Sequence, residues 1–254
     1  MNIDKFNESI FDAKYKRLLG SRYCRKTDIP REFDTISEFI YKSLIGWEDG
    51  KGWPDESLLY DGSEMLGGRR WMYLWSMING GKLNSSMTVL DLGAHDVSVQ
   101  FALAKLGLNV TSADFSDSNL LAAIRRGVLL GLIPKMTFRL YDMRSSIILG
   151  KFDRVYCISV LEHVLPITSR IKSYKNIADM VIKNGKALIS VDISPNRLEF
   201  YTPSRIMEMI DVFQNNGLIL DNSAVGEDFA KEPPLNAVWS KSKVTWAGLL
   251  FNKT

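Results

Sequence analysis

The sequence predicts an α/β fold in which a mostly parallel, seven-stranded sheet with an antiparallel last strand follows a helical N-terminal cap. From Ser85 onward, short apolar strands alternate with helices, which is typical of a parallel sheet buried on both faces. Before Ser85, apolar residues recur at helical spacing. The last two strands follow one another without a helix, which favours an antiparallel pair. We therefore expect a cap over residues 1–84 and the sheet region over residues 85–254.

Two helices are expected in the cap, joined by a loop. Two sets of apolar residues are each spaced like one face of a helix: Ile36, Phe39, Ile40 and Leu44, and then Trp71, Leu74, Trp75 and Ile78. Residues 47–68 between them carry Gly, Pro and Asp, which predicts an ordered loop. The aromatic and acidic side chains of this loop suit stacking on a sugar or another polar ring. They also fit a surface loop with a few buried anchors.

The alternating region predicts its elements in order. Strands are expected at residues 88–92, 109–115, 136–141, 152–158, 186–193, 218–225 and 243–251. Helices are expected at residues 97–106, 118–130, 169–183 and 203–215. Gly185 is placed to stop the third of these helices, and Pro203 to begin the fourth.

The charge balance disfavours a nucleic-acid partner, because 32 basic and 29 acidic residues leave a formal net charge of only +3. The densest basic clusters, residues 14–17 and 22–26, fit the solvated face of a terminal helix. Cys24 and Cys157 lie far apart, which gives neither a disulfide framework nor a metal-ligand spacing. The chain shows no signal-peptide pattern and no apolar run long enough to span a bilayer. We expect a cytoplasmic protein without a metal site.

The segment TVLDLGAHDVSVQFALAKLG, which begins at Thr88, places a turn and a helix after an apolar strand. The strand ends near Asp91 and Gly93, so backbone N–H groups are expected at the carboxyl edge of the sheet, where open α/β folds bind ligands. Asp114 ends the following strand. A carboxylate there can accept hydrogen bonds from ribose hydroxyls.

Three segments together resemble one family. VLDLG, VTSADFS and FDRVYCISVLEHV are similar to motifs of class I S-adenosylmethionine-dependent methyltransferases, and specifically of the subgroup with a VLEHV segment after the fourth strand. The resemblance covers residues 69–254, and its most specific part runs from Phe152 to Val164. It implies a Rossmann-like sheet and S-adenosyl-L-methionine as the cofactor.

The resemblance also implies a set of cofactor contacts. The residues concerned are Asp91, Gly93 and Ala94 at the methionyl part, Asp114 and Phe115 at the ribose, Asp142 and Met143 at the adenine, Cys157 near the sulfonium, and Arg70 or Tyr73 at the carboxylate. Met143 fits a core position equally well. Arg70 and Tyr73 lie in a segment that also fits an amphipathic helix, with its tryptophans in the core and its arginines solvated.

The turn after the first strand departs from the family. The family pattern D-x-G-x-G-x-G becomes Asp91, Gly93, His95 and Val97, so two of the three glycines are replaced. Gly93 is retained where the backbone is expected to approach the cofactor most closely, whereas His95 and Val97 disfavour conformations that only glycine adopts easily. An NAD-dependent enzyme would lose more by this change, because it needs this loop to bind the pyrophosphate of its cofactor. S-adenosylmethionine has no phosphate. The change leaves open a weak or inactive cofactor site.

Histidine is the first candidate for removing a proton from an acceptor hydroxyl. The chain has two, His95 and His163, and both fall in segments expected to border the cofactor. His163 is the preferred base, although it also fits a residue that packs the start of the next helix. Asp192, at the end of a strand, and Tyr201 are the remaining candidate proton acceptors. Asp192 also fits a solvated carboxylate.

These observations predict methyl transfer from S-adenosyl-L-methionine to a small polar acceptor, with an oxygen of a sugar, nucleotide sugar or related metabolite as the first choice. Nitrogen methylation of a small metabolite is the second, since it needs less help from a base. The sequence also fits a cofactor-binding protein without catalysis. It fits an RNA methyltransferase less well, because the charge balance does not predict RNA binding. No membrane partner is expected, and a homodimer is left open.

Overall fold

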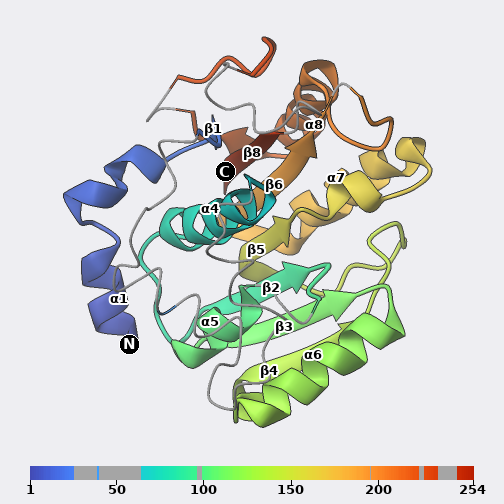
Figure 1. Ribbon diagram of the computed structural model, residues 1–254. Helices are drawn as coiled ribbons and strands as arrows, with labels where there is room; N and C mark the ends of the chain where they lie inside the picture. The colour runs from blue at the N-terminus through green and yellow to red at the C-terminus, as the bar shows by residue number, and fades with distance from the viewer. Residues whose placement is uncertain (26–38, 40–63, 96–98, 195, 223–225, 234–244) are drawn as a thin grey trace.

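The computed structural model describes residues 1–25, 39, 64–95, 99–194, 196–222, 226–233 and 245–254, which form an α/β fold around one sheet (Figure 1). The strands are β1 (Arg22–Tyr23), β2 (Thr88–Leu92), β3 (Asn109–Asp114), β4 (Met136–Leu140), β5 (Phe152–Ile158), β6 (Val181–Ile193), β7 (Leu218–Leu220) and β8 (Thr245–Lys253). The α-helices are α1 (Ile3–Ser9), α4 (Glu64–Asn79), α5 (Gln100–Lys105), α6 (Asp117–Leu129), α7 (Arg170–Met180) and α8 (Pro203–Asn215). Four 3₁₀ helices are also described: η1 (Ala13–Leu18), η4 (Ile133–Lys135), η5 (Leu161–His163) and η6 (Ile167–Ser169).

The sheet follows the order β1-β8-β6-β5-β2-β3-β4, and β7 pairs with β8. Figure 1 shows the strands of this order one after another from top to bottom. The strands from β6 to β4 are parallel to one another, whereas β8 is antiparallel to β6, β7 and β1. The α/β class, the mostly parallel sheet and the antiparallel last strand are thus confirmed.

The described sheet has eight strands, one more than the sequence predicts. The additional strand is β1, which pairs with Ala247 and Gly248 near the other end of the chain. The interpretation of residues 22–26 as a solvated helix face is therefore wrong where they are described. Arg22 is buried in β1, and Arg25 forms an ion pair with Glu227 at 2.7 Å.

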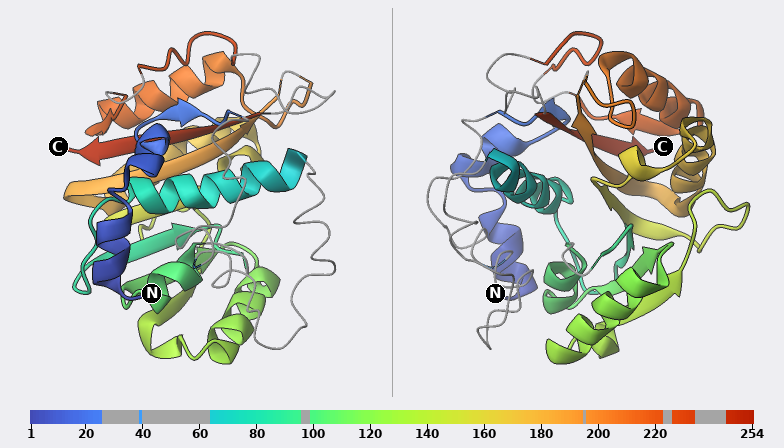
Figure 2. Two further views of the ribbon diagram at one scale, coloured as in Figure 1. Left: turned by 60° about the vertical axis from the view of Figure 1, so that its left-hand side comes forward. Right: turned by 45° about the vertical axis from the view of Figure 1, so that its right-hand side comes forward.

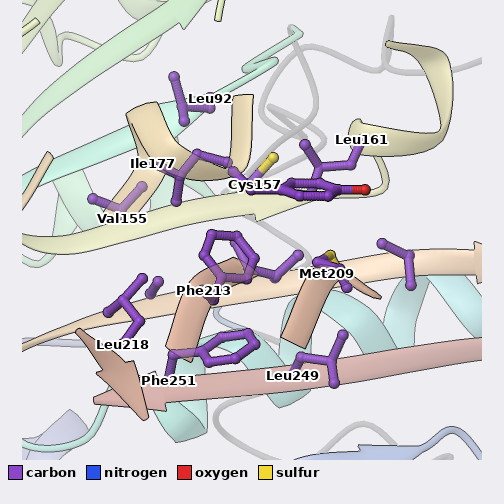
Figure 3. Close-up of a cluster of buried hydrophobic side chains, with 14 of the residues drawn as sticks. Leu92, Val155, Cys157, Leu161, Ile177, Met209, Phe213, Leu218, Leu249 and Phe251 are labelled. Atoms are coloured by element: carbon purple, nitrogen blue, oxygen red, sulfur yellow. The ribbon is translucent and has the colours of Figure 1, made fainter. Parts of the chain in front are cut away.

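Two hydrophobic clusters fill the two faces of the sheet. One lies beneath α4, α5 and α6 and includes Trp71, Phe101 and Ala123. The other lies beneath α7 and α8 (Figure 3), where the rings of Phe213 and Phe251 have their centroids 4.7 Å apart. Because both faces are covered, the functional side chains are expected at the sheet's carboxyl edge.

Helix α4 lies across one face of the sheet, as Figure 2 shows. Trp71 and Trp75 on this helix are fully buried and stack with their ring centroids 5.8 Å apart. The indole N–H of Trp75 donates to the carbonyl of Gly20 at 3.0 Å. Gly248 of β8 lies so close that an added Cβ would be 2.5 Å from the Trp75 ring. The tryptophans thus occupy the core, as an amphipathic helix predicts.

The boundary between α7 and β6 differs from the expectation. The helix ends at Met180 rather than at residue 183, and β6 begins at Val181, which pairs with Phe152 of β5. Gly185 lies within β6 and does not stop the helix. The register of the β5–β6 pairing shifts in this stretch, where Asn184 has a φ of 64°. Cross-strand pairing has overridden the helical pattern that continued along the chain.

Some expectations fall outside the described residues. These are the helix at residues 36–44 apart from Phe39, the loop at 47–68 up to residue 63, the start of the helix at 97–106, and parts of the last two strands. Among the helices that the structure does describe, none is long and apolar enough to cross a membrane. The described side chains also contain no group of three or more His, Cys, Asp or Glu able to hold a metal ion.

Candidate active site

The carboxyl ends of β5, β2, β3 and β4 meet at one edge of the sheet. Leu92 pairs with both Ala113 and Cys157, and Asp114 pairs with Leu140. The loops that follow these residues are therefore neighbours, although they are far apart along the chain. This edge brings together the predicted residues at 91–94, 114–115, 142–143 and 157.

The turn after β2 is held by the backbone of β3. Gly93 has a φ of 67°, and an added Cβ would lie 2.4 Å from a methyl carbon of Val160, which follows β5. The N–H groups of Gly93 and Ala94 both donate to the carbonyl of Ala113, at 2.8 and 3.1 Å. The turn itself therefore requires glycine at this position. The two N–H groups are used within the fold, so the expectation that they face a ligand is not supported.

Asp114 and Phe115 end β3 in different environments. The Asp114 side chain is buried, and its Oδ1 accepts from the backbone N–H of Ser116 at 2.8 Å and from the Asn119 amide at 3.3 Å. Among the described residues, none donates a hydrogen bond to Oδ2. The ring of Phe115 is 69% exposed. One carboxylate oxygen thus shapes the turn, while the other remains available next to an exposed aromatic residue.

Asp142 is bound to a neighbouring arginine. Both of its oxygens accept from the Arg144 guanidinium, at distances from 2.6 to 3.0 Å, and Arg144 also donates to the carbonyl of Leu165 at 2.6 Å. The Arg144 hydrogen bonds lower the pKa of the Asp142 carboxyl below its usual value. Met143 lies in the core cluster under α7, as the second of its two interpretations has it. Any contact of Asp142 with an adenine would therefore be shared with Arg144.

Cys157 and Asp91 are fully buried. Burial is the largest of the effects that raise the pKa of the Cys157 thiol well above its usual value. The thiol therefore stays protonated, and Cys157 can face a ligand only through its backbone.

A buried carboxyl that the sequence interpretation missed lies just after β5. Glu162 is fully buried in η5, and its Oε1 is 2.8 Å from the hydroxyl of Ser159. The same hydroxyl lies 2.8 Å from Oδ1 of Asp192 at the end of β6. The backbone N–H of Asp192 also donates to Oε1 of Glu162 at 3.3 Å. Asp192 is thus held by a network, and it is half-buried, so it also keeps part of the solvent access of its second interpretation.

Tyr201 is not available as a proton acceptor. Its ring is fully buried and its hydroxyl lies 2.6 Å from that of Tyr174, while the guanidinium of Arg170 lies 5.0 Å from its ring centroid. Burial raises the pKa of Tyr201 well above its usual value and that of Tyr174 to about 12. A buried phenol with a raised pKa cannot serve as a base near neutral pH, so the predicted role of Tyr201 is not supported.

The two histidines are exposed. His163 ends η5, where its backbone N–H donates to the carbonyl of Val160 at 2.9 Å, and His95 follows the Gly93 turn. The second interpretation of His163, a residue that packs the start of the next helix, stays a prediction. Tyr73 is half-buried on α4, and only the backbone of Arg70 is described.

Residues 90–189, which run from β2 to β6 and include most of this edge, match a family model described as "Methyltransferase domain". The chain contains a class I S-adenosylmethionine-dependent methyltransferase domain. Its cofactor is S-adenosylmethionine, as the sequence motifs imply. No curated protein sequence matches the chain significantly.

Solved structures share the fold of the methyltransferase domain. The magnesium protoporphyrin IX methyltransferase of Synechocystis PCC 6803, with bound SAM, has a TM-score of 0.55 and 18% identity, over 89% of this chain and 100% of that chain. A protein of Galdieria sulphuraria, provisionally named a sarcosine dimethylglycine methyltransferase, has a TM-score of 0.54 and 15% identity. The match covers 86% of this chain and 98% of that chain. The [4+2]-cyclase SpnF has a TM-score of 0.50 and 13% identity, over 67% and 76%. At such identities the likeness shows the fold alone, and the reactions in these names differ.

The described residues fit S-adenosylmethionine best at its ribose. Asp114 offers a carboxylate oxygen without a hydrogen bond from the described residues, and the exposed ring of Phe115 follows it directly. The methionyl end would meet the turn after β2, of which residues 96–98 lie outside the described part. The adenine end would meet the Asp142–Arg144 pair.

Proposed function

We propose that this methyltransferase transfers the methyl group of S-adenosylmethionine to an oxygen of a small polar acceptor, with the cofactor ribose held by Asp114. The position of Asp114 carries this proposal. Its Oδ1 is fixed by the Ser116 N–H, which aims the second oxygen without a further loss of side-chain freedom. A carboxylate oxygen that accepts from a ribose hydroxyl forms a charge-assisted hydrogen bond.

S-adenosylmethionine supplies an electrophilic methyl group, so the chain's own residues have to bind, align and exclude water. In this proposal the ring of Phe115 covers the adenosine, and residues 91–94 and 157 line the methionyl part with backbone atoms. Arg144 shares Asp142 with the adenine, and Tyr73 or Arg70 approaches the cofactor carboxylate from α4. The N-terminal region, apart from β1 in the sheet, is the proposed cap over the acceptor.

An oxygen acceptor fits the carboxylates and histidines at this edge. A hydroxyl must lose its proton as the new bond forms, and the candidates to take it are Asp192, near the end of β6, and His163, in η5 after β5. A sugar or nucleotide sugar remains the first choice of acceptor. Nitrogen methylation is the second, because an amine needs less assistance from a base.

The test of this proposal is turnover. The protein is incubated with S-adenosylmethionine and a small-molecule cell extract, and metabolites are screened by mass spectrometry for the gain of one methylene together with the formation of S-adenosylhomocysteine. We expect one small polar metabolite to gain this mass, and we expect no gain in the control from which S-adenosylmethionine is omitted. Methylation found only on RNA or protein would contradict the proposal.

Two observations favour the second candidate function, a cofactor-binding protein without catalysis. The N–H groups of Gly93 and Ala94 are both used by Ala113, and two glycines of the family's turn are replaced. Tight S-adenosylmethionine binding without turnover on any extract would favour this second function.

A further inference from the structure

The hydroxyl of Ser159 has one proton but two carboxyl neighbours. Its Oγ lies 2.8 Å from Oε1 of Glu162 and 2.8 Å from Oδ1 of Asp192. A serine hydroxyl donates one hydrogen bond and can accept others. For both short contacts to be hydrogen bonds, one of the two carboxyls must carry a proton and donate it to Ser159.

Burial decides which carboxyl is protonated. Glu162 is fully buried, and its Oε2 has no hydrogen-bond partner among the described residues. An ionised carboxylate with an unpaired oxygen in that position is costly, whereas the neutral acid is tolerated. Asp192 is only half-buried and keeps access to solvent. Burial, and then the charge of Asp192, raise the pKa of the Glu162 carboxyl, in agreement with a neutral Glu162.

The other polar groups around Glu162 do not change this assignment. The Asp192 N–H, 3.3 Å from Oε1, lowers the pKa of the Glu162 carboxyl, but burial and the charge of Asp192 are the larger effects. Cys157 on β5 and Tyr201 remain neutral because burial raises the pKa of each. Arg170 on α7 donates to the backbone carbonyl of Glu162 at 2.6 Å, not to its carboxyl. The proton order is therefore from Glu162 to Ser159 and from Ser159 to Asp192.

Ser159 contacts both carboxyls from a strained backbone conformation. Its φ is 55°, a left-handed conformation that is unfavourable for a residue other than glycine. The N–H of Ser159 donates to the carbonyl of Ser190 at 3.0 Å, which ties the turn after β5 to the neighbouring strand β6. Strain of this kind is common at functional sites, and here it directs the hydroxyl at both carboxyls.

We propose that Asp192 receives the proton that the acceptor hydroxyl loses during methyl transfer, and that Ser159 and neutral Glu162 are positioning residues that hold the Asp192 carboxylate. The inference rests on the proposed function. The acceptor oxygen forms a bond to the methyl carbon, and its O–H bond breaks as the proton moves to Asp192. The methyl–sulfur bond breaks with its electron pair remaining on sulfur, and Asp192 then releases the proton to solvent.

Four variants test the roles of Asp192, Ser159 and Glu162. The assay measures the transfer of a labelled methyl group from S-adenosylmethionine to the small-molecule extract. Asp192→Asn should lower kcat by ~10²-fold or more, since it removes the proton acceptor. Ser159→Ala and Ser159→Gly should both lower kcat by roughly tenfold, although glycine relieves the strained φ. Glu162→Gln should keep kcat within about threefold of the wild type, because its amide still donates to Ser159. The charge-matched controls are Asp211→Asn and Glu208→Gln, both exposed on α8.

Infrared spectroscopy tests the proton assignment without an acceptor. At neutral pH the wild type should show the C=O band of a protonated carboxyl. That band should disappear in Glu162→Gln, persist in Glu208→Gln and shift in Ser159→Ala. Absence of the band in the wild type would overturn the assignment of the proton to Glu162.

Two further outcomes are decisive. Normal turnover by Asp192→Asn, or a kcat loss in His163→Ala with none in Asp192→Asn, would overturn the role of Asp192. A wild type that does not bind S-adenosylmethionine by calorimetry would refute the proposed function instead, and the infrared result would still decide the proton order.

Discussion

At the scale of single residues, Gly93 is explained by the fold before any ligand is considered. Gly93→Ala puts a Cβ on left-handed backbone and 2.4 Å from Val160. We expect the free energy of unfolding to fall by about 2–4 kcal/mol, from strain and collision together, in urea denaturation. Adding Val160→Ala should recover the part due to the collision and leave the strain. A Gly93→Ala protein as stable as the wild type would contradict this geometry.

Glu162 should make stability depend on pH. Burial raises the pKa of the Glu162 carboxyl in the folded protein. The contribution of Glu162 to the free energy of unfolding is therefore complete below the unfolded pKa of about 4.3 and is lost as pH rises through the folded pKa. Glu162→Gln removes this titration. The stability of the wild type relative to Glu162→Gln should therefore fall as pH rises across that window, by at most about 1.4 kcal/mol per pH unit. Thermal unfolding of both proteins over a pH series measures this, and a constant difference would refute it.

The sequence predicts part of the candidate site. It places Gly93, Asp114 and Cys157 at strand ends, and parallel pairing brings these ends together. It does not single out Glu162, although that residue stands inside the VLEHV motif. Its burial and its contact with Asp192 depend on β6, which lies much later in the chain, and no local pattern encodes them.

At the scale of elements, local signals predict some boundaries and fail at others. The strand at Phe152–Ile158 and the helix at Pro203–Asn215 have the bounds that the sequence predicts. The helix has a proline in its first turn and a Thr202 side chain that accepts from the Arg205 N–H. β1 has no such signal, because a two-residue strand is stabilised only by its distant partner β8. Its existence could not be inferred from local sequence.

Asn79, at the end of α4, holds the N-terminal segment in place. Its amide donates to the carbonyls of Leu18 and Trp75 at 2.7 and 2.9 Å, and its oxygen accepts from the Gly20 N–H at 2.8 Å. Asn79→Ala leaves buried backbone groups unpaired, so we expect a loss of about 2–4 kcal/mol in the free energy of unfolding. The exposed Asn84→Ala should change it by less than about 0.5 kcal/mol. Equal effects of the two variants in urea denaturation would show that Asn79 does not hold this segment.

At the scale of the whole molecule, the two hydrophobic clusters leave the sheet's edge as the place for chemistry. The helices α4 to α6 cover one face, and α7 and α8 cover the other. The carboxyl edge between them gathers Asp114 at the end of β3, Ser159 just after β5 and Asp192 near the end of β6. The sequence predicts this architecture well, because alternating strands and helices permit few arrangements.

The most direct test of the account is calorimetric titration of S-adenosylmethionine into the wild type, Asp114→Asn and Asp117→Asn. Asn at position 114 can still accept from the Ser116 N–H, so the turn is preserved while the second oxygen is replaced by a donor. Asp117 is exposed in the first turn of α6 and provides the matched change of charge. We expect Asp114→Asn to weaken binding by about 1–3 kcal/mol, which is about 5- to 150-fold in Kd, and Asp117→Asn to bind like the wild type. Equal affinity of all three proteins, or no binding by the wild type, would contradict the account.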